Sequence, residues 1–211
     1  MINNEPTYLY YQKNILDKLE LEKLKKWLNS KSFKSGSLNE KEIGRKQLWY
    51  QKNHKYFCSK WKYKYDRWKS ESYDNYLLDL ESKINNIVNV ICEKNNLKQL
   101  NINSCLINKY RNGNDSIKPH KDNIDSFGEY PIIIGLSVGE SRDLIFRKIL
   151  NHESNSLKND DNYDPLTFKL EDNSLFIMAG ASQKYFTHEV PKNDSPNTRY
   201  SLTFREFIDH E

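Results

Sequence analysis

Apolar residues recur at helical spacing in two stretches of the first hundred residues. The first stretch spans residues 14–29 and the second spans residues 73–95, and each places its apolar side chains on one face between charged positions. The apolar positions are Ile15, Leu16, Leu19, Leu24, Trp27, Leu28, then Tyr76, Leu77, Leu80, Ile84, Ile87, Val88 and Ile91. Such a pattern predicts two amphipathic helices, each packing its apolar stripe against a sheet.

After residue 100 the pattern changes to short apolar runs separated by turn residues. The runs predict strands at 104–110, 131–138, 143–148, 167–170, 174–179 and 198–207. The stretches 30–44 and 151–165 are polar and show little periodicity, so they are expected to be loops. Two helices followed by several short strands indicate an α+β protein, a small β-barrel or jelly roll braced by its N-terminal helices.

Residues 45–69 contain short runs rich in aromatic residues that favour β-strands, and this pattern predicts one or two hairpins. Positive charge is concentrated here, since residues 41–70 hold ten Lys and Arg against two Asp and Glu, a balance of +8. Basic side chains neutralise phosphates and aromatic faces stack on exposed bases, so the segment has the composition of a nucleic-acid-binding surface. An ordinary lysine-rich surface over a small aromatic core fits the same pattern.

Composition narrows the class of protein. A chain of 211 residues fits one large domain, and it contains no run near the ~20 apolar residues of a membrane span. The first residues lack the basic and apolar regions of a signal peptide, and three scattered cysteines do not form a disulfide framework. We therefore expect a monomeric intracellular protein, in the nucleus or cytoplasm, with no membrane partner.

One candidate metal site follows from His120-Lys121-Asp122. In an extended chain alternate residues share a face, so His120 and Asp122 can hold one ion together. A third ligand is available in His188. Two histidines and one carboxylate are the ligand set of non-haem Fe(II) oxygenases, although His-x-Asp alone is a weak signal.

The last predicted strand alternates cleanly. One face carries Arg199, Ser201, Thr203 and Arg205, and the other face carries Tyr200, Leu202 and Phe204. If the apolar face packs on the helices, both arginines point into the barrel, where a guanidinium needs an anionic partner. A dicarboxylate ligand held by bidentate contacts is one such partner, and a pair of structural salt bridges is the alternative.

These residues stand in a recognisable order. Together they resemble the AlkB family of nucleobase dealkylases. The resemblance rests on Asn108-Lys109-Tyr110, Gly113, Asp115, Ile117, His120-x-Asp122, the run from Pro131 to Gly139, Arg142 to Arg147 and Asn173 to Met178. The closing block, His188-Glu189-Val190-Pro191 followed by Arg199 to Arg205, is similar to that family's closing signature. A shorter match, Gly44-Arg45-Lys46-Gln47 with Tyr50, resembles the edge of the family's nucleotide-recognition lid.

The resemblance implies a double-stranded β-helix (jelly-roll) core over residues 101–211. Residues 1–100 would supply the helices and a basic, β-rich lid, all within one compact domain. It also implies an Fe(II)- and 2-oxoglutarate-dependent dioxygenase whose catalytic iron is held by His120, Asp122 and His188. In this family's pattern, 2-oxoglutarate would be bound by Asn108, Tyr110, Arg199, Thr203 and Arg205.

The implied reaction is oxidative demethylation of N-alkylated bases in DNA or RNA, with release of formaldehyde, succinate and CO2. The expected lesions are 1-methyladenine and 3-methylcytosine, whose methyl groups block pairing and ease extrusion from the stack. Substrate contacts are expected from Arg45 and Lys46 on phosphates, Tyr56 or Phe57 on the base, and Asp125 near the cation.

Two positions depart from the family's pattern. Ile124 stands where many members carry a base-contacting acid, and Ser201 replaces an asparagine. Two other functions remain open, a related oxygenase acting on a protein or small molecule, and a non-catalytic nucleic-acid-binding relative.

Overall fold

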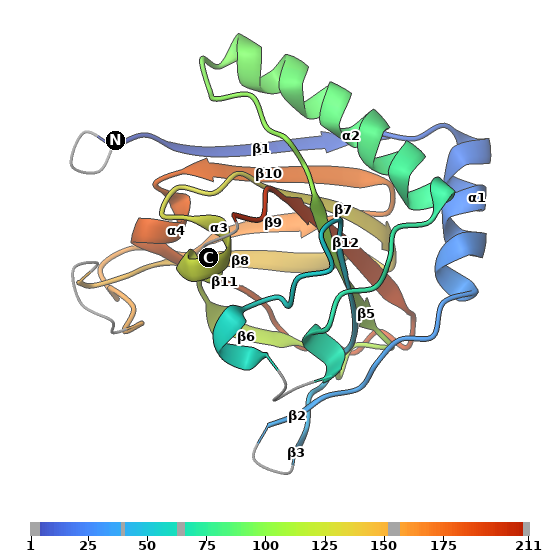
Figure 1. Ribbon diagram of the computed structural model, residues 1–211. Coiled ribbons are helices and arrows are strands. Elements are labelled where there is room, and N and C mark those ends of the chain that lie inside the picture. Colours follow the sequence, from blue (N-terminus) through green and yellow to red (C-terminus); the bar gives the residue numbers. More distant parts are fainter. Residues whose placement is uncertain (1–4, 39–40, 63–65, 152–156, 209–211) are drawn as a thin grey trace.

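Two antiparallel sheets lie face to face in the computed structural model, which describes residues 5–38, 41–62, 66–151 and 157–208 (Figure 1). The larger sheet has the order β1 (Thr7–Lys13), β10 (Ser174–Gly180), β7 (Ile133–Gly139), β12 (Arg199–Arg205), β5 (Ser104–Tyr110) and β4 (Lys46–Gln51). The smaller sheet has the order β6 (Ile117–His120), β11 (Phe186–Val190), β8 (Arg142–Lys148) and β9 (Leu166–Leu170). The predicted jelly-roll arrangement is therefore present.

Strand alternation divides the apolar residues between two layers. Side chains pointing from the larger sheet toward the smaller one form an inner core with residues of β8, β9 and β11, namely Tyr110, Ile133, Leu144, Phe146, Leu170, Phe176, Met178 and Val190. The alternate positions of the larger sheet, such as Tyr200, Leu202 and Phe204, face the other way and pack on the helices. This second layer is the larger of the two cores.

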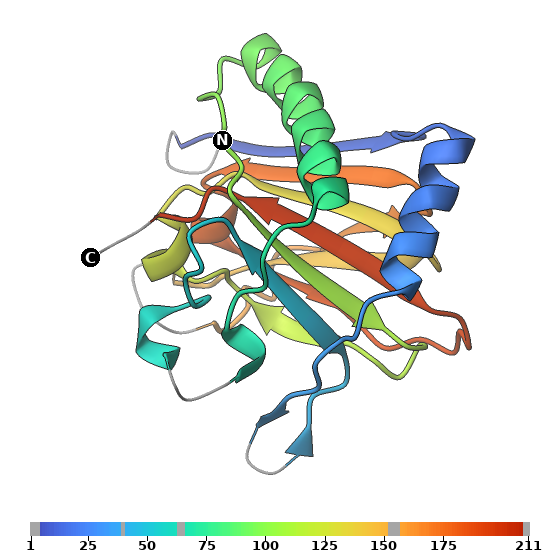
Figure 2. The same ribbon diagram turned by 45° about the vertical axis from the view of Figure 1, so that its right-hand side comes forward.

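Both predicted helices are present and cover the same outer face of the larger sheet (Figure 2). They are α1 (Lys18–Asn29) and α2 (Asn75–Lys94). Asp17 starts α1 with a capping box shared with Glu20, and the Asp74 side chain accepts from the Leu77 amide to start α2. The first helix is shorter than predicted, and Leu19, assigned to its apolar face, is 64% exposed.

The six predicted strands correspond to β5, β7, β8, β9, β10 and β12. Three further strands of the two main sheets, β1, β6 and β11, escaped prediction, as did the one-turn helices α3 (Ile124–Phe127) and α4 (Ser182–Tyr185). The sequence of β6 is Ile-Lys-Pro-His and that of β11 is Phe-Thr-His-Glu-Val. Each carries a histidine that lines the cavity described below, and neither strand shows the apolar pattern of a core strand.

The two loop and hairpin predictions before residue 70 need correction. The stretch 30–44 contains a small hairpin of β2 (Ser37–Leu38) and β3 (Lys41–Glu42). The described residues of 45–69 form no hairpin, because β4 joins the larger sheet beside β5 and two short 3-10 helices, η1 (Ser59–Trp61) and η2 (Asp66–Trp68), follow it. Trp49, Phe57 and Trp68 build a third core with Phe127 of α3. Within the predicted loop 151–165, residues 152–156 lie outside the described residues.

The larger sheet draws strands from both halves of the chain. β1 and β4 come from the first hundred residues and pair with β10 and β5, which come from the second. The expected boundary at residue 100 therefore falls between elements of one sheet. Among the described residues, no helix is both long and apolar enough to cross a membrane.

Candidate active site

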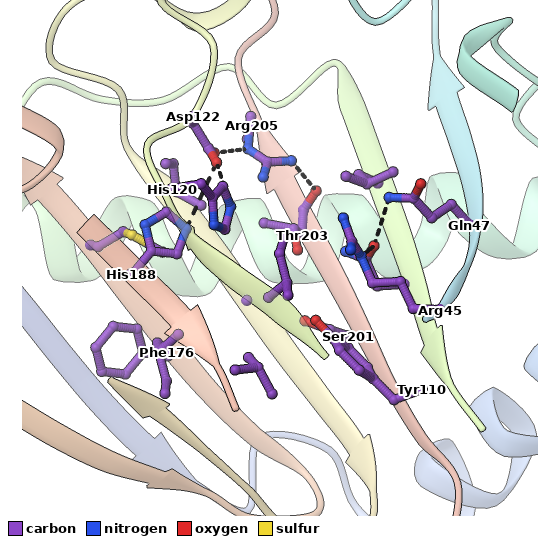
Figure 3. Close-up of a pocket in the computed structure, with 18 of the residues that line it drawn as sticks. Arg45, Gln47, Tyr110, His120, Asp122, Phe176, His188, Ser201, Thr203 and Arg205 are labelled. Atoms are coloured by element: carbon purple, nitrogen blue, oxygen red, sulfur yellow. Dashed lines mark hydrogen bonds and ion pairs between the residues drawn. The ribbon is translucent and has the colours of Figure 1, made fainter. Parts of the chain in front are cut away.

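A cavity of about 230 Å³ lies between the two sheets, where β6, β11 and β12 converge on β4 and β5 (Figure 3). Its walls include all of the charged and polar residues predicted for the metal and the dicarboxylate. Apolar residues of the inner core, such as Phe176 and Met178, close its far end. The cavity is thus polar along one wall and apolar along the other.

Strand pairing brings the three predicted metal ligands together. His120 ends β6 and lies directly opposite His188 of β11 in the register of the smaller sheet, and Asp122 follows two residues later. The Oδ1 atom of Asp122 is 3.8 Å from the Nε2 atom of each histidine. One donor atom from each residue lies within 4.8 Å of the others, close enough to surround one ion. This single strand pair brings His188 close to Asp122, although 66 positions separate them in sequence.

The two histidines have lone pairs available for a metal. His120 Nδ1 lies 2.9 Å from the carbonyl oxygen of Lys118, which can only accept, so Nδ1 is the donor and Nε2 carries the lone pair. Burial is the main cause that lowers the pKa of His188 to about 3, and the neighbouring His120 lowers it further. Burial also lowers the pKa of His120. Both rings are therefore neutral at pH 7.

Asp122 is held in its ionised form. Burial by itself would raise its pKa, but the guanidinium of Arg205, whose Nε donates to Oδ2 at 2.7 Å, acts together with His188 and His120 to outweigh this effect, and the pKa is lowered. The backbone amide of Asp122 donates to Oε1 of Gln183 at 2.8 Å. These two contacts fix the carboxylate so that Oδ1 faces the histidines. For Arg205 the structure therefore shows a salt bridge, which is the alternative to a dicarboxylate partner given above.

Arg199 is different, because its charge has no acidic partner among the described residues. It is 2% exposed, and only Nη2 makes a hydrogen bond, to Oγ of Ser137 at 2.9 Å. Its Nε and Nη1 atoms are buried without a hydrogen-bond partner among the described residues. Burial lowers the pKa of Arg199, with the adjacent Tyr110 opposing that shift. A buried guanidinium with two unused donors at a cavity is strongly favoured to bind a carboxylate.

A polar cluster stands beside Arg199 at the end of β5. The side-chain oxygen of Asn108 accepts from Nε of Arg45 at 3.0 Å and from Nε2 of Gln47 at 2.9 Å. The guanidinium of Arg199 also lies over the ring of Tyr110, 5.1 Å from its centroid. Asn108 and Tyr110 therefore line the cavity next to the unsatisfied donors, as the resemblance implied.

The structure places all eight residues predicted for the metal and 2-oxoglutarate on this cavity. They are Asn108, Tyr110, His120, Asp122, His188, Arg199, Thr203 and Arg205. Ser201, the departure from the family's asparagine, also lines it. Alternation along β12 gives this result, since odd-numbered residues face the cavity and even-numbered residues face the helices.

The five residues predicted to contact substrate are scattered. Arg45 lines the cavity but is engaged by Asn108, and Lys46 lies on the opposite face of β4, which carries Leu48 and Tyr50 toward the helices. Phe57 is 7% exposed and packs in the third core, with one edge on the cavity. Tyr56 and Asp125 line a second cavity, and Asp125 pairs with Lys60 at 2.6 Å.

Three residues at or behind the cavity were not predicted. Gln183 does not line the cavity but accepts from the Asp122 amide from α4, and Trp68 and Asn123 are part of the cavity lining. Asn123 also accepts from the Ser126 amide and so starts α3. A polar residue before a helical turn is the one available sequence signal, and nothing in the local pattern marks Gln183 or Trp68.

Comparison with known proteins agrees with this geometry. Residues 8–205 match the model of the 2OG-Fe(II) oxygenase superfamily. The human alpha-ketoglutarate-dependent dioxygenase alkB homolog 3 is 41% identical over 105 residues, covering 49% of this chain and 36% of that protein. The Arabidopsis thaliana DNA oxidative demethylase ALKBH2 is 32% identical over 116 residues, covering 49% and 37%. The chain therefore spans little more than a third of the length of these relatives.

Solved structures share the fold. The structure of OsALKBH1 matches with a TM-score of 0.61 at 14% identity, covering 95% of this chain and 97% of that one. A Trichoplax adhaerens prolyl hydroxylase bound to a peptide fragment matches with a TM-score of 0.58 at 14% identity, covering 95% and 83%. The predicted fold class and the resemblance to the AlkB family are confirmed.

Proposed function

Because the chain belongs to the 2OG-Fe(II) oxygenase superfamily, we propose that it removes methyl groups oxidatively from N-alkylated bases in DNA or RNA. The observation that carries this proposal is the buried, unsatisfied guanidinium of Arg199 beside the His120, Asp122 and His188 cluster. One cavity thereby offers a metal site and a carboxylate site together.

The donor set fits Fe(II). Two neutral imidazoles and one carboxylate are the ligands that mononuclear Fe(II) oxygenases use. His120, Asp122 and His188 would hold the ion, and hydrogen bonds orient two of them, His120 through the Lys118 carbonyl and Asp122 through Arg205. Iron bound here with 2-oxoglutarate supplies the oxidising power that removes a hydrogen from an unactivated methyl group.

The walls around the metal ligands suit 2-oxoglutarate. Arg199 would receive one carboxylate through its two unused donors, with Tyr110 and Asn108 alongside. Thr203 and Arg205 lie between that point and the metal ligands, near the second carboxylate of such a ligand. The overall reaction converts N–CH3, O2 and 2-oxoglutarate into N–H, formaldehyde, succinate and CO2.

The opposite end of the cavity would receive the base. Phe57 and Trp68, whose ring centroids are 4.5 Å apart, form an apolar edge there, and Asn123 adds a hydrogen-bonding group. A base reaches this depth only when it leaves its stack. Lesions that block the pairing edge leave most easily, which favours 1-methyladenine and 3-methylcytosine as substrates.

Two observations support a nucleic acid as the substrate. Residues 41–70 carry a balance of +8, and Arg45, Phe57 and Trp68 of this segment line the cavity. The relatives include a protein named as a DNA oxidative demethylase. We accordingly retain DNA or RNA as the partner, and the monomeric state and the nuclear or cytoplasmic location stay predictions.

The test is product detection with oligonucleotides. Single-stranded DNA and RNA carrying 1-methyladenine or 3-methylcytosine should release formaldehyde only when Fe(II) and 2-oxoglutarate are both present. The His188→Ala variant is the matched control. Formaldehyde from a methylated peptide but not from any oligonucleotide would favour a protein oxygenase, and binding of oligonucleotides without turnover would favour a non-catalytic relative.

A further inference from the structure

A second cavity, of about 660 Å³, adjoins the active-site cavity. One wall is the segment from His54 to Lys62, and the other is formed by Ile124, Asp125 and Ser126 of α3 with the residues just after β12. None of the residues that line it belongs to the metal and 2-oxoglutarate sites described above.

Two stretches of backbone separate the two cavities, one around Tyr56 and Phe57 and the other around Asn123 and Ile124. Tyr56 lines the second cavity and its neighbour Phe57 lines the first, and Ile124 and Asn123 divide in the same way. Neighbouring residues of the same two segments therefore face different cavities, so the two cavities are adjacent. The hydroxyl of Ser126 donates to the carbonyl of Phe57, which ties the two walls together at the partition.

The lining has the chemistry of a nucleotide site. Lys55, Lys60 and Lys62 contribute positive charge against the single carboxylate of Asp125, while Tyr56 and Phe207 offer aromatic surface. Basic groups bind phosphates and aromatic faces stack on bases without regard to sequence.

An exposed ion pair spans this cavity. Nζ of Lys60 is 2.6 Å from Oδ2 of Asp125, with side chains 73% and 49% exposed. Such a pair is weakly held in water, so an incoming phosphate can take over the ammonium group. Asp125 then sits beside the strand rather than inside the base-binding cavity.

We infer that this second cavity binds the nucleotide next to the target base on the same strand, with its base against Tyr56 and its phosphate on Lys60 and Lys62. The inference rests on the proposed function. A base enters the cavity only when it is unpaired, so the site selects a single strand or a locally opened duplex. It also assigns Tyr56 to the neighbouring base instead of the flipped base.

The experiment compares two substrates that differ only in the neighbouring nucleotides. One is a methylated nucleoside monophosphate and the other is a trinucleotide with the same methylated base at its centre. In the wild-type protein, kcat/KM should be at least tenfold higher for the trinucleotide, since stacking and phosphate contacts are added. Tyr56→Leu and Lys60→Gln should each lower that ratio about tenfold, while Lys94→Gln at the end of α2 should leave it unchanged.

Binding of an unmethylated, fluorescent trinucleotide provides the second readout. It should weaken in Tyr56→Leu and Lys60→Gln and not in Lys94→Gln, with melting temperatures confirming that all three variants fold. A ratio or an affinity that is the same in all variants would overturn the inference. Absence of formaldehyde from every substrate, with trinucleotide binding lost in the two cavity variants, would refute the proposed function and leave the second cavity as a nucleotide-binding site without demethylation.

Discussion

Replacing Arg199 with methionine should stabilise the empty protein and abolish its stabilisation by 2-oxoglutarate. The guanidinium is 2% exposed and leaves two donors unsatisfied, so in the empty protein its burial costs free energy. Methionine fills similar volume without charge. Removing an uncompensated buried charge should therefore raise the free energy of unfolding by at least about 1 kcal/mol, which is roughly 2–4 °C in Tm for a domain of this size.

The change in stabilisation by bound 2-oxoglutarate is larger than the change in stability of the empty protein. A ligand at a hundred times its Kd adds about 2.7 kcal/mol to the stability of the protein, or roughly 5–10 °C. Two hydrogen bonds between charged groups contribute about 1.5–3 kcal/mol each, so their loss in Arg199→Met should raise the Kd for 2-oxoglutarate at least a hundredfold. At the same ligand concentration, the shift in Tm should then fall to about 1–2 °C.

Differential scanning calorimetry with and without 2-oxoglutarate, in the presence of Mn(II) to prevent turnover, measures both effects. Arg142→Met is the matched control, because Arg142 is equally buried but donates to the carbonyl oxygens of Asn112, Asp115 and Pro191. That variant should lose stability. A lower Tm for empty Arg199→Met, or an undiminished shift with 2-oxoglutarate, would show that Arg199 has a structural role.

Three further outcomes are expected. His188→Ala should lower bound Fe(II) from about one ion per chain toward none while the circular dichroism spectrum is preserved, and full metal content would remove His188 from the site. Burial raises the pKa of Glu81, so the protonated carboxyl stabilises the fold at a pH below its pKa in the unfolded chain. This stability is lost as the pH rises through the pKa of the folded protein, so the stability of Glu81→Gln, measured by urea titration, should depend less on pH above about 4. An unchanged pH dependence in this variant would contradict the reasoning. Leu28→Ala, at a fully buried position between α1 and the sheet, should cost about 2–5 kcal/mol in chemical denaturation, and a loss below 1 kcal/mol would contradict the packing described.

The sequence predicts the parts of this fold whose residues follow a period. α2 and β12 are examples, because the apolar residues of each lie on one face and pack in the core, while the other face is polar. The eight residues predicted for the metal and 2-oxoglutarate could be placed on one cavity because they stand on such strands or in short motifs.

The remaining parts depend on tertiary contacts that leave no local pattern. β6 is four residues long and contains a proline, and it exists as a strand because His120 pairs with His188 across the smaller sheet. Phe57 and Trp68 pack with Phe127 of α3 instead of forming a hairpin, and Phe57 and Phe127 lie 70 positions apart in sequence. Lys46 lies on the face of β4 that is turned to the helices, and neither a charge count nor a short motif tells which face a lysine occupies.

Formaldehyde release from a single-stranded oligonucleotide carrying one 1-methyladenine or 3-methylcytosine tests the central claim most directly. We predict one formaldehyde and one succinate for each methyl group removed, strict dependence on Fe(II) and 2-oxoglutarate, and loss of both products in His188→Ala and Arg199→Met. Formaldehyde release that persists in these two variants, or succinate formation that no methylated DNA or RNA stimulates, would contradict the assignment.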